Sequence, residues 1–172
     1  MITIFGYGSL MNEESIKKTL ASVSNLRPVR LYGFVRVFDF PSTTRFSEID
    51  KRPCAVLNIQ ETSPDKFING VCFDIKEEDF ENYKKREEGY ELIKVIVEEL
   101  TTNKKIEAIT VQAKTNSPTE FIFESATQIE YLHTCISGCR DISEEYVEHF
   151  HKTTIINGKI LEEIEIEEIK RH

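Results

Sequence analysis

The sequence has no long hydrophobic run and no excess of positive charge, and each absence excludes a class of protein. No apolar stretch approaches the roughly 20 residues that a membrane-spanning helix needs. The net charge of −8 at pH 7 disfavours binding to the phosphates of nucleic acids or anionic lipids. The amino-terminal segment also lacks the basic start and the apolar core of a secretory signal. We therefore expect a cytoplasmic protein with no nucleic-acid partner and no membrane partner.

Clusters of metal-ligating residues are also missing. The four cysteines are Cys54, Cys72, Cys135 and Cys139. Cys54 and Cys72 lie in apolar, strand-like segments, where a thiol behaves as a small hydrophobic group. Cys135 and Cys139 share a helical face, but only His133 is close to them in sequence, which is too few ligands for a zinc site. We expect reduced thiols in the core and no bound metal.

The chain shows no fixed-period repeat and no low-complexity linker. Its length of 172 residues and its hydrophobic content of 40% are those of an ordinary globular domain. We expect one domain over residues 1–172, with an acidic, isoleucine-rich carboxyl-terminal extension from about residue 157. The pattern of that extension does not distinguish a strand from a helix.

Apolar and β-branched runs predict a sheet-rich fold. Strands are predicted at residues 2–7, 31–40, 54–59, 68–75, 91–100 and 105–114. The aromatic segment 31–40 is expected to form one strand that is buried on both faces. The polar segment 41–53, bounded by prolines, is expected to be a mobile loop. The short polar connection before residue 105 predicts an antiparallel hairpin.

Capping signals predict where helices begin and end. Helices are predicted at residues 13–23, 77–88, 127–139 and 143–152. Asn12 is the expected cap of the first helix, and Thr127 with Glu130 would form a capping box for the third. Asn157-Gly158 predicts a two-residue hairpin turn. Together these elements indicate an α+β fold in which helices pack on a curled or closed, mainly antiparallel sheet.

Glu87 occupies an unexpected position in the second of these helices. Phe80 and Tyr83 mark its apolar face, and Glu87 lies on that face, seven and four residues further on. Glu88 is rotated away from it and should face solvent. Burying a carboxylate without a partner costs several kcal/mol. Glu87 is therefore either a solvated charge at the end of the helix or a residue that meets a ligand.

A second unusual segment, Gly6-Tyr7-Gly8-Ser9, joins a predicted strand to a predicted helix. Two glycines let the backbone approach a ligand closely, and successive N–H groups at such a turn can hold an anion. The segment lacks the Lys-Ser/Thr ending of a phosphate-binding loop. A tight turn around a buried Tyr7 explains the same residues without a ligand.

Three motifs together resemble the γ-glutamylcyclotransferase-like proteins. These motifs are YGSL near the amino terminus, GVCFDI before a helix, and REEGY before a β-branched strand. The resemblance continues through the late helices and covers most of the chain. It implies a small mixed β-barrel with helices around it. It also implies release of 5-oxoproline from γ-glutamyl compounds without a metal or an organic cofactor.

The resemblance also assigns residues to roles. The YGSL loop, here Tyr7, Gly8, Ser9 and Leu10, would bind the γ-glutamyl group. The glutamate after the arginine of REEGY, here Glu87, would be the general acid/base. The family often has an acidic residue where this chain has Lys84. The leucine of YGSL is closer to the branch that acts on glutathione, but the motifs do not distinguish a γ-glutamyl amine, amino acid or peptide.

The implied reaction fits these parts. The α-amino group of the substrate attacks its own γ-carbonyl carbon, and a five-membered ring forms as an amine leaves. Because both reacting groups belong to one small molecule, the protein mainly has to fold that molecule into a reactive geometry. One carboxylate between the two nitrogens can accept the first proton and donate the second. The loop N–H groups would hold the substrate carboxylate or the developing oxyanion.

Two other functions remain open at this stage. The same fold could serve as a small-molecule binding module without activity, because a fold alone does not prove catalysis. An acyl-transfer hydrolase would need Cys54 or Ser9 as nucleophile together with a histidine. The four histidines are late in the chain and none has a recognisable orienting partner. These are His133, His149, His151 and His172. The oligomeric state is open, and the expected partner is a small γ-glutamyl molecule.

Overall fold

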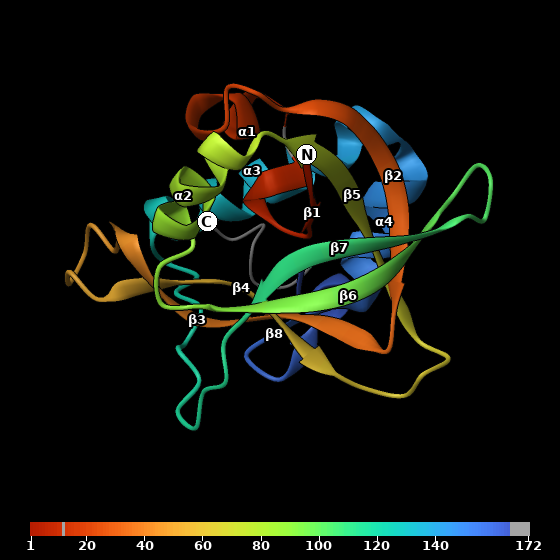
Figure 1. The fold of residues 1–172 in the computed structure, drawn as a ribbon. Coiled ribbons are helices and arrows are strands. Elements are labelled where there is room, and N and C mark those ends of the chain that lie inside the picture. The colour runs from red at the N-terminus through yellow and green to blue at the C-terminus, as the bar shows by residue number, and fades with distance from the viewer. Residues whose placement is uncertain (12, 166–172) are drawn as a thin grey trace.

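The computed structural model describes residues 1–11 and 13–165. Its strands are β1 (Ile2–Gly6), β2 (Ser24–Tyr32), β3 (Phe34–Phe46), β4 (Pro53–Glu61), β5 (Phe67–Ile75), β6 (Glu91–Glu99), β7 (Lys105–Gln112), β8 (Thr154–Ile156) and β9 (Lys159–Ile160). Its helices are the short 3₁₀ turn η1 (Ser9–Met11), α1 (Glu13–Thr19), α2 (Glu77–Arg86), α3 (Ala126–Ile142), α4 (Glu144–Thr153) and α5 (Leu161–Glu165). Figure 1 shows the barrel with helices around it.

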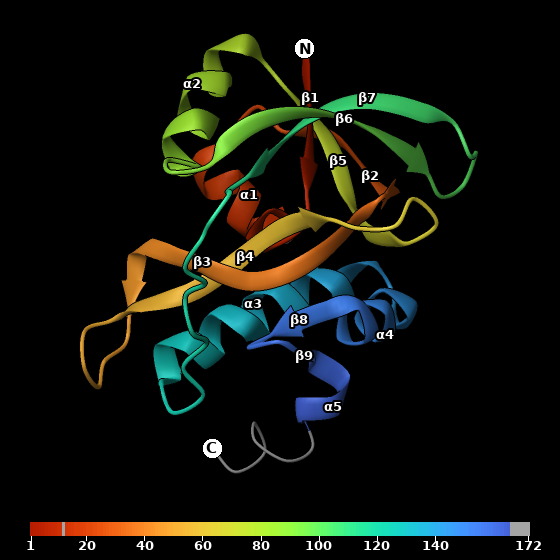
Figure 2. The same cartoon turned by 90° about the horizontal axis from the view of Figure 1, so that it is seen from below.

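The strands form two sheets. Five of them make a closed barrel in the order β1-β5-β2-β6-β7, and the second sheet has the order β4-β3-β8-β9. The barrel closes where β1 and β7 run parallel, with Ile4 opposite Ile109, and its other pairs are antiparallel. Figure 2 shows α3 and α4 on the side of the molecule that carries the second sheet. The predicted α+β fold, with a mixed and mainly antiparallel barrel flanked by helices, is confirmed.

The prediction of one strand over residues 31–40 is wrong. Gly33 has a φ of +83°, in the left-handed region that favours glycine, and the chain turns there. Tyr32 therefore ends a barrel strand, and Phe34 begins a strand of the second sheet. The residues on each side of Gly33 are equally strand-like, so sequence composition could not separate them.

The prediction that residues 41–53 form a loop is only half right. β3 continues to Phe46, and its later part still pairs with β4, where Pro41 is opposite Ala55 and Phe46 is opposite Pro53. On its other edge β3 pairs with β8 only at residues 36–38. Proline cannot donate to a neighbouring strand, but at Pro41 that edge has no partner strand among the described residues, so the proline is tolerated.

Several helix ends differ from expectation. α1 ends at Thr19, because β2 already begins at Ser24. The cap of α3 is Ser125, whose Oγ accepts a hydrogen bond from the Gln128 N–H, and not the Thr127–Glu130 box. The expected helix start at Ser143 is confirmed, since its Oγ accepts from the Tyr146 N–H at 3.2 Å. The expected cap Asn12 lies outside the described residues.

The carboxyl-terminal region contains both kinds of element. Asn157 and Gly158 have φ values of +48° and +81° and form the predicted hairpin between β8 and β9. A short helix, α5, follows directly, and its Leu161 and Ile164 are buried. Residues 166–172, the rest of the expected extension, lie outside the described residues.

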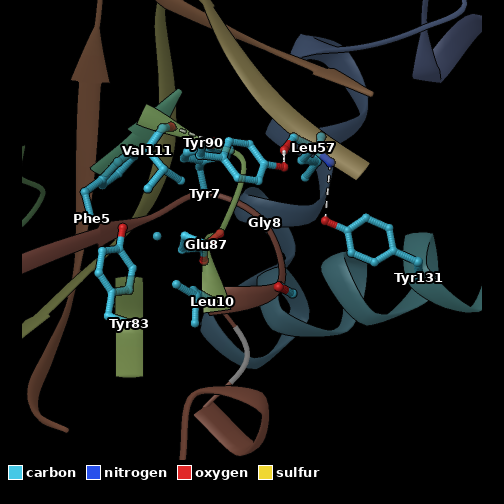
Figure 3. Close-up of a pocket in the computed structure, with 12 residues that line it drawn as sticks. Phe5, Tyr7, Gly8, Leu10, Leu57, Tyr83, Glu87, Tyr90, Val111 and Tyr131 are labelled. Atoms are coloured by element: carbon cyan, nitrogen blue, oxygen red, sulfur yellow. Dashed lines mark hydrogen bonds between the residues drawn. The ribbon is translucent and has the colours of Figure 1, made fainter. Parts of the chain in front are cut away.

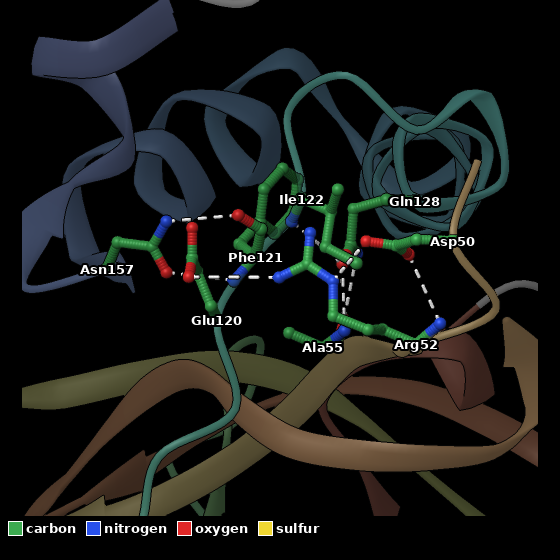
Figure 4. A network of polar contacts seen from close by, with 8 residues as sticks. All are labelled: Asp50, Arg52, Ala55, Glu120, Phe121, Ile122, Gln128 and Asn157. Atoms are coloured by element: carbon green, nitrogen blue, oxygen red, sulfur yellow. Dashed lines mark hydrogen bonds and ion pairs between the residues drawn. The ribbon is translucent and has the colours of Figure 1, made fainter. Parts of the chain in front are cut away.

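A network of polar contacts fixes the start of α3 against the second sheet (Figure 4). The Gln128 side chain accepts from the Ala55 N–H at 2.8 Å and donates to the Ala55 carbonyl at 2.9 Å. Asn157 makes a similar pair of hydrogen bonds with the backbone of Phe121. This network holds α3 in place, and α3 carries Tyr131 toward the site described below.

The described residues contain no helix that is long and apolar enough to cross a membrane. Over the same ranges, no three or more histidine, cysteine, aspartate or glutamate side chains are grouped so that they could hold a metal ion. All four cysteines are buried and free.

Candidate active site

An inner pocket of about 40 Å³ opens beside the end of β1 (Figure 3). Segments that are far apart in the sequence supply its walls. Its lining residues are Phe5, Gly6, Tyr7, Gly8, Ser9, Leu10, Leu57, Tyr83, Glu87, Tyr90, Val111 and Tyr131. The structure therefore brings the YGSL segment and Glu87 together in one pocket.

The glycines of the YGSL segment allow a tight turn from β1 into η1. A Cβ on Gly6 would lie 2.7 Å from the carbonyl oxygen of Leu10, so a side chain there would force the backbone apart. A Cβ on Gly8 would lie 3.2 Å from a methyl group of Leu57. The Met11 N–H donates to the Gly8 carbonyl at 3.1 Å and closes the turn.

The hydroxyl and the backbone carbonyl of Tyr7 both form hydrogen bonds inside the protein. Its hydroxyl donates to the Val111 carbonyl at 2.7 Å, and its own carbonyl accepts from Arg36 Nε at 2.8 Å. Because the two sides of a trans peptide point in opposite directions, the Gly8 N–H points away from Arg36. The ring of Tyr7 is 5% exposed and packs as part of the core.

Arg36 is a fully buried cation behind this loop. It also donates through Nη2 to the backbone carbonyl and the side-chain oxygen of Asn69, and its guanidinium lies 4.9 Å from the centre of the Phe150 ring. Burial lowers the pKa of Arg36. No carboxylate pairs with it in the described part of the chain. Burying this cation costs free energy, and its hydrogen bonds hold the backbone carbonyls of Tyr7 and Asn69 in place.

Glu87 is the cap at the carboxyl end of α2, which ends at Arg86, two residues earlier than predicted from the sequence. Its N–H donates to the Tyr83 carbonyl at 3.0 Å, and Gly89, with a φ of +96°, then turns the chain into β6. The residue is half-buried and lines the inner pocket, whereas Glu88 is exposed and does not.

The electrostatic surroundings of Glu87 favour its neutral form. Burial raises the pKa of its carboxyl group to about 7, and the nearby Arg86 opposes part of that rise. Within residues 1–11 and 13–165, the carboxylate has no ion pair and no hydrogen-bond donor. A group with a pKa close to neutrality can both accept and donate a proton in this pocket.

Arg86 connects the end of α2 to the loop and to α1. Its Nη1 donates to the Ser15 carbonyl and the Thr19 hydroxyl, both at 2.9 Å. Its Nη2 donates to the hydroxyls of Ser15 at 2.9 Å and Ser9 at 3.3 Å. The residue before Glu87 therefore fixes the position of the YGSL segment relative to Glu87.

A larger outer pocket of about 590 Å³ adjoins the inner one. The two share Ser9, Glu87, Tyr90 and Tyr131, and the remaining wall of the outer pocket includes residues 40–45 of β3. Three cationic side chains line the outer pocket, namely Arg45, Lys85 and Arg86. The Arg45 guanidinium lies 4.8 Å from the centre of the Tyr131 ring. This wall comes from the segment expected to be a loop, so the sequence did not reveal it.

Sequence reasoning also missed the aromatic residues of the site. Tyr90 donates to the Leu57 carbonyl at 2.7 Å, and the Tyr131 hydroxyl accepts from the Leu57 N–H at 3.3 Å. Tyr83 lines the inner pocket as well. Tyr90 belongs to the REEGY motif and Tyr83 lies on the same helical face as Glu87, so the sequence did contain patterns that could have placed both tyrosines in the site. No sequence pattern could have placed Tyr131 in the site, because only the fold brings α3 close to the YGSL segment.

The residues that an acyl-transfer hydrolase would need are not assembled. Among the described residues, no histidine lines the inner or the outer pocket. Cys54 is buried outside both pockets, and burial raises the pKa of its thiol. The Ser9 hydroxyl accepts from Arg86, a cation that cannot take its proton. This arrangement gives no support to the nucleophile–histidine alternative.

Solved structures that are similar to this chain include gamma-glutamyl cyclotransferases. No curated protein matches the chain. A solved structure called gamma-glutamyl cyclotransferase is similar over 99% of both chains, with a TM-score of 0.69 and 21% identity. A yeast gamma-glutamyl cyclotransferase specific to glutathione is similar over 99% of this chain and 96% of its own, with a TM-score of 0.67 and 16% identity. An uncharacterised human protein is similar over 96% of both chains, with a TM-score of 0.67 and 22% identity.

At these identities the solved structures establish the fold, in agreement with the resemblance seen in the sequence. The family evidence is separate. The model of the ChaC-like proteins matches residues 2–168, which is nearly the whole chain. The chain therefore belongs to the ChaC-like protein family.

Proposed function

We propose that this protein is an enzyme of the γ-glutamylcyclotransferase type, which releases 5-oxoproline from a γ-glutamyl amine, amino acid or peptide. The observation that carries the proposal is the pairing of one half-buried carboxylate, unpartnered among the described residues, with a glycine-containing loop in the same pocket. Membership of the ChaC-like family and the shared fold support it. In this proposal Glu87 is the general acid/base, and Tyr7, Gly8, Ser9 and Leu10 bind the γ-glutamyl group.

The proposed reaction needs no external reactant. The α-amino nitrogen forms a bond to the γ-carbonyl carbon, and the bond from that carbon to the departing nitrogen breaks. Glu87 accepts a proton from the α-amino nitrogen and returns one to the departing nitrogen, so the carboxylate is regenerated in each cycle. Its pKa of about 7 suits both transfers at neutral pH.

The two pockets suggest how the substrate lies. The inner pocket would hold the γ-glutamyl group, and the departing amine would extend past Glu87 into the larger outer pocket. That pocket offers room for a peptide, and its three cationic side chains outnumber the carboxylates of Glu87 and Glu88 in the same wall, which leaves a small excess of positive charge for a free carboxylate. Because a similar yeast structure is described as specific to glutathione, glutathione is the first substrate to test.

The test is an assay of 5-oxoproline release from a panel of γ-glutamyl compounds. The panel should contain glutathione, γ-glutamyl amino acids and a γ-glutamylamine. The proposal expects release from at least one of them. Binding of these compounds without any release would favour the alternative of a silent binding module on the same fold. If none of these compounds is turned over or bound, the proposed function and the binding-module alternative are both refuted.

A further inference from the structure

Tyr83 lines the inner pocket, but its hydroxyl has no role within the protein. The side chain is 0% exposed, and the hydroxyl finds no hydrogen-bond partner among the described residues. It lies four residues before Glu87, on the same face of α2, and Figure 3 shows both side chains at the pocket. A buried hydroxyl without a partner costs about 1–3 kcal/mol. Native proteins rarely keep such a group without a use for it.

The other tyrosines of the pocket are already engaged. The hydroxyls of Tyr7 and Tyr90 donate to backbone carbonyls at 2.7 Å, and that of Tyr131 accepts from a backbone N–H at 3.3 Å. Of the pocket tyrosines in the described part of the chain, Tyr83 alone has an unpartnered hydroxyl. It is therefore the one available to a ligand.

The hydroxyl of Tyr83 acts as a donor. Burial, and then the nearby charge of Glu87, raise the pKa of Tyr83 well above its usual range, so the phenol keeps its proton at neutral pH. A ligand atom that satisfies it has to be an acceptor. In a γ-glutamyl compound the acceptors near the reacting groups are the α-carboxylate oxygens and the γ-carbonyl oxygen.

The position of Tyr83 distinguishes between these two acceptors. Tyr83 lines the inner pocket only, whereas Ser9, Glu87, Tyr90 and Tyr131 line both pockets and mark the passage between them. If the amine departs through the outer pocket, the γ-carbonyl lies near this passage. The α-carbon then lies further in, where Tyr83 is. Because that carbon carries both the amino group that Glu87 deprotonates and the carboxylate, the carboxylate lies within reach of Tyr83.

We propose that the Tyr83 hydroxyl donates a hydrogen bond to the α-carboxylate of the γ-glutamyl group. This inference rests on the proposed function and adds a determinant of specificity to it. Binding would satisfy the buried hydroxyl and would replace part of the hydration that the carboxylate loses. The site would then favour substrates that carry an α-carboxylate over those that carry only the amino and amide groups.

The test compares Tyr83→Phe with the unaltered protein on two substrates. One is a γ-glutamyl peptide, and the other is the matching 4-aminobutyryl peptide, which lacks only the α-carboxylate and cyclises to 2-pyrrolidinone. Tyr83→Phe should lower kcat/KM for the γ-glutamyl peptide about 10- to 100-fold, the usual effect of one hydrogen bond to a charged group. It should leave kcat/KM for the 4-aminobutyryl peptide unchanged. An equal loss on both substrates, or no loss on either, overturns the inference.

A second variant separates this effect from simple loss of a buried hydroxyl. Tyr146 is buried outside both pockets, and its hydroxyl donates to the Gly70 carbonyl at 2.9 Å. Tyr146→Phe should unfold at a lower urea concentration and should not change the preference between the two substrates. Tyr83→Phe should unfold no more easily than the unaltered protein, because it removes an unsatisfied group.

Calorimetric binding of the products keeps the inference distinct from the proposed function. If no γ-glutamyl compound is turned over, the proposed function fails, but binding still tests Tyr83. The unaltered protein should bind 5-oxoproline more tightly than 2-pyrrolidinone, and Tyr83→Phe should lose about 10-fold or more of that preference. Equal binding of both compounds, no binding, or a preference that survives the substitution overturns the role of Tyr83.

Discussion

Replacing Glu87 with glutamine keeps the shape of the side chain but removes its ability to accept a proton. General acid/base catalysis typically contributes about 10²- to 10⁴-fold. Because one carboxylate would serve both transfers, we expect Glu87→Gln to reduce 5-oxoproline release by an amount near the upper end of that range. The matched control is Glu88→Gln, which removes the neighbouring, exposed carboxylate. Because Glu88 lines only the outer pocket and not the inner one, this substitution should cost far less. Near-normal release by Glu87→Gln would contradict the assigned role.

The same residue predicts how stability depends on pH. The folded protein raises the pKa of Glu87 from its usual 4.5 to about 7, so between these values the folded state holds a proton that the unfolded state has lost. The free energy of unfolding contributed by this group is therefore highest below about pH 4.5 and falls as pH rises toward 7. Urea denaturation should show Glu87→Gln gaining stability over the unaltered protein from pH 5 to pH 8, by up to about 3 kcal/mol. An advantage that shrinks over this range would show that Glu87 is not buried as described.

At the scale of elements, the link between α2 and the YGSL segment can be tested through Arg86. Its guanidinium group donates hydrogen bonds to Ser9, Ser15 and Thr19. Lysine keeps the charge but cannot reproduce this geometry. Arg86→Lys should lower stability by about 1–3 kcal/mol, since it leaves part of the network unpaired. It should also lower kcat for 5-oxoproline release, because Ser9 would no longer be fixed relative to Glu87.

The matched control for Arg86→Lys is Arg140→Lys. Arg140 is exposed on α3, where its ion pair with Glu144 is long at 3.9 Å. Exposed pairs of this kind contribute little to stability. We expect no measurable change in unfolding or in release. If both substitutions behave alike, the network around Arg86 does not position the loop.

Local sequence patterns account for the predictions from the sequence that were confirmed. The start of helix α2, the hairpin at Asn157-Gly158 and the start of α4 depend on local rules of capping and turn formation, and each was found where expected. The break at Gly33 was missed because it separates two segments of equal strand propensity. Glu87 and the glycine turn attracted notice because a helical face and a glycine turn are local patterns, whereas the roles predicted for Glu87 and residues 7–10 came from the resemblance to a known family. Tyr131 and the wall formed by residues 40–45 depend on long-range pairing, which no local pattern encodes.

At the scale of the whole molecule, the expected reaction needs only side chains and backbone of the chain itself. We predict that 5-oxoproline release survives exhaustive dialysis against a chelator, because the sequence offers too few ligands at metal spacing for a zinc site. The measurement is the rate before and after dialysis, followed by addition of zinc, magnesium or manganese. Loss of release with recovery on adding one metal would overturn the prediction.

The contacts behind the loop also determine when the enzyme becomes active during its own folding. Tyr7 bonds to Val111, 104 positions away in the chain, and Arg36 reaches Tyr7 from the other sheet. Contacts this distant in sequence close late, because the entropy of a long chain segment must be lost first. Folding intermediates with intact helices should therefore lack activity. In a stopped-flow refolding experiment, catalytic competence should return in the slowest phase that restores native structure, with no active species before it.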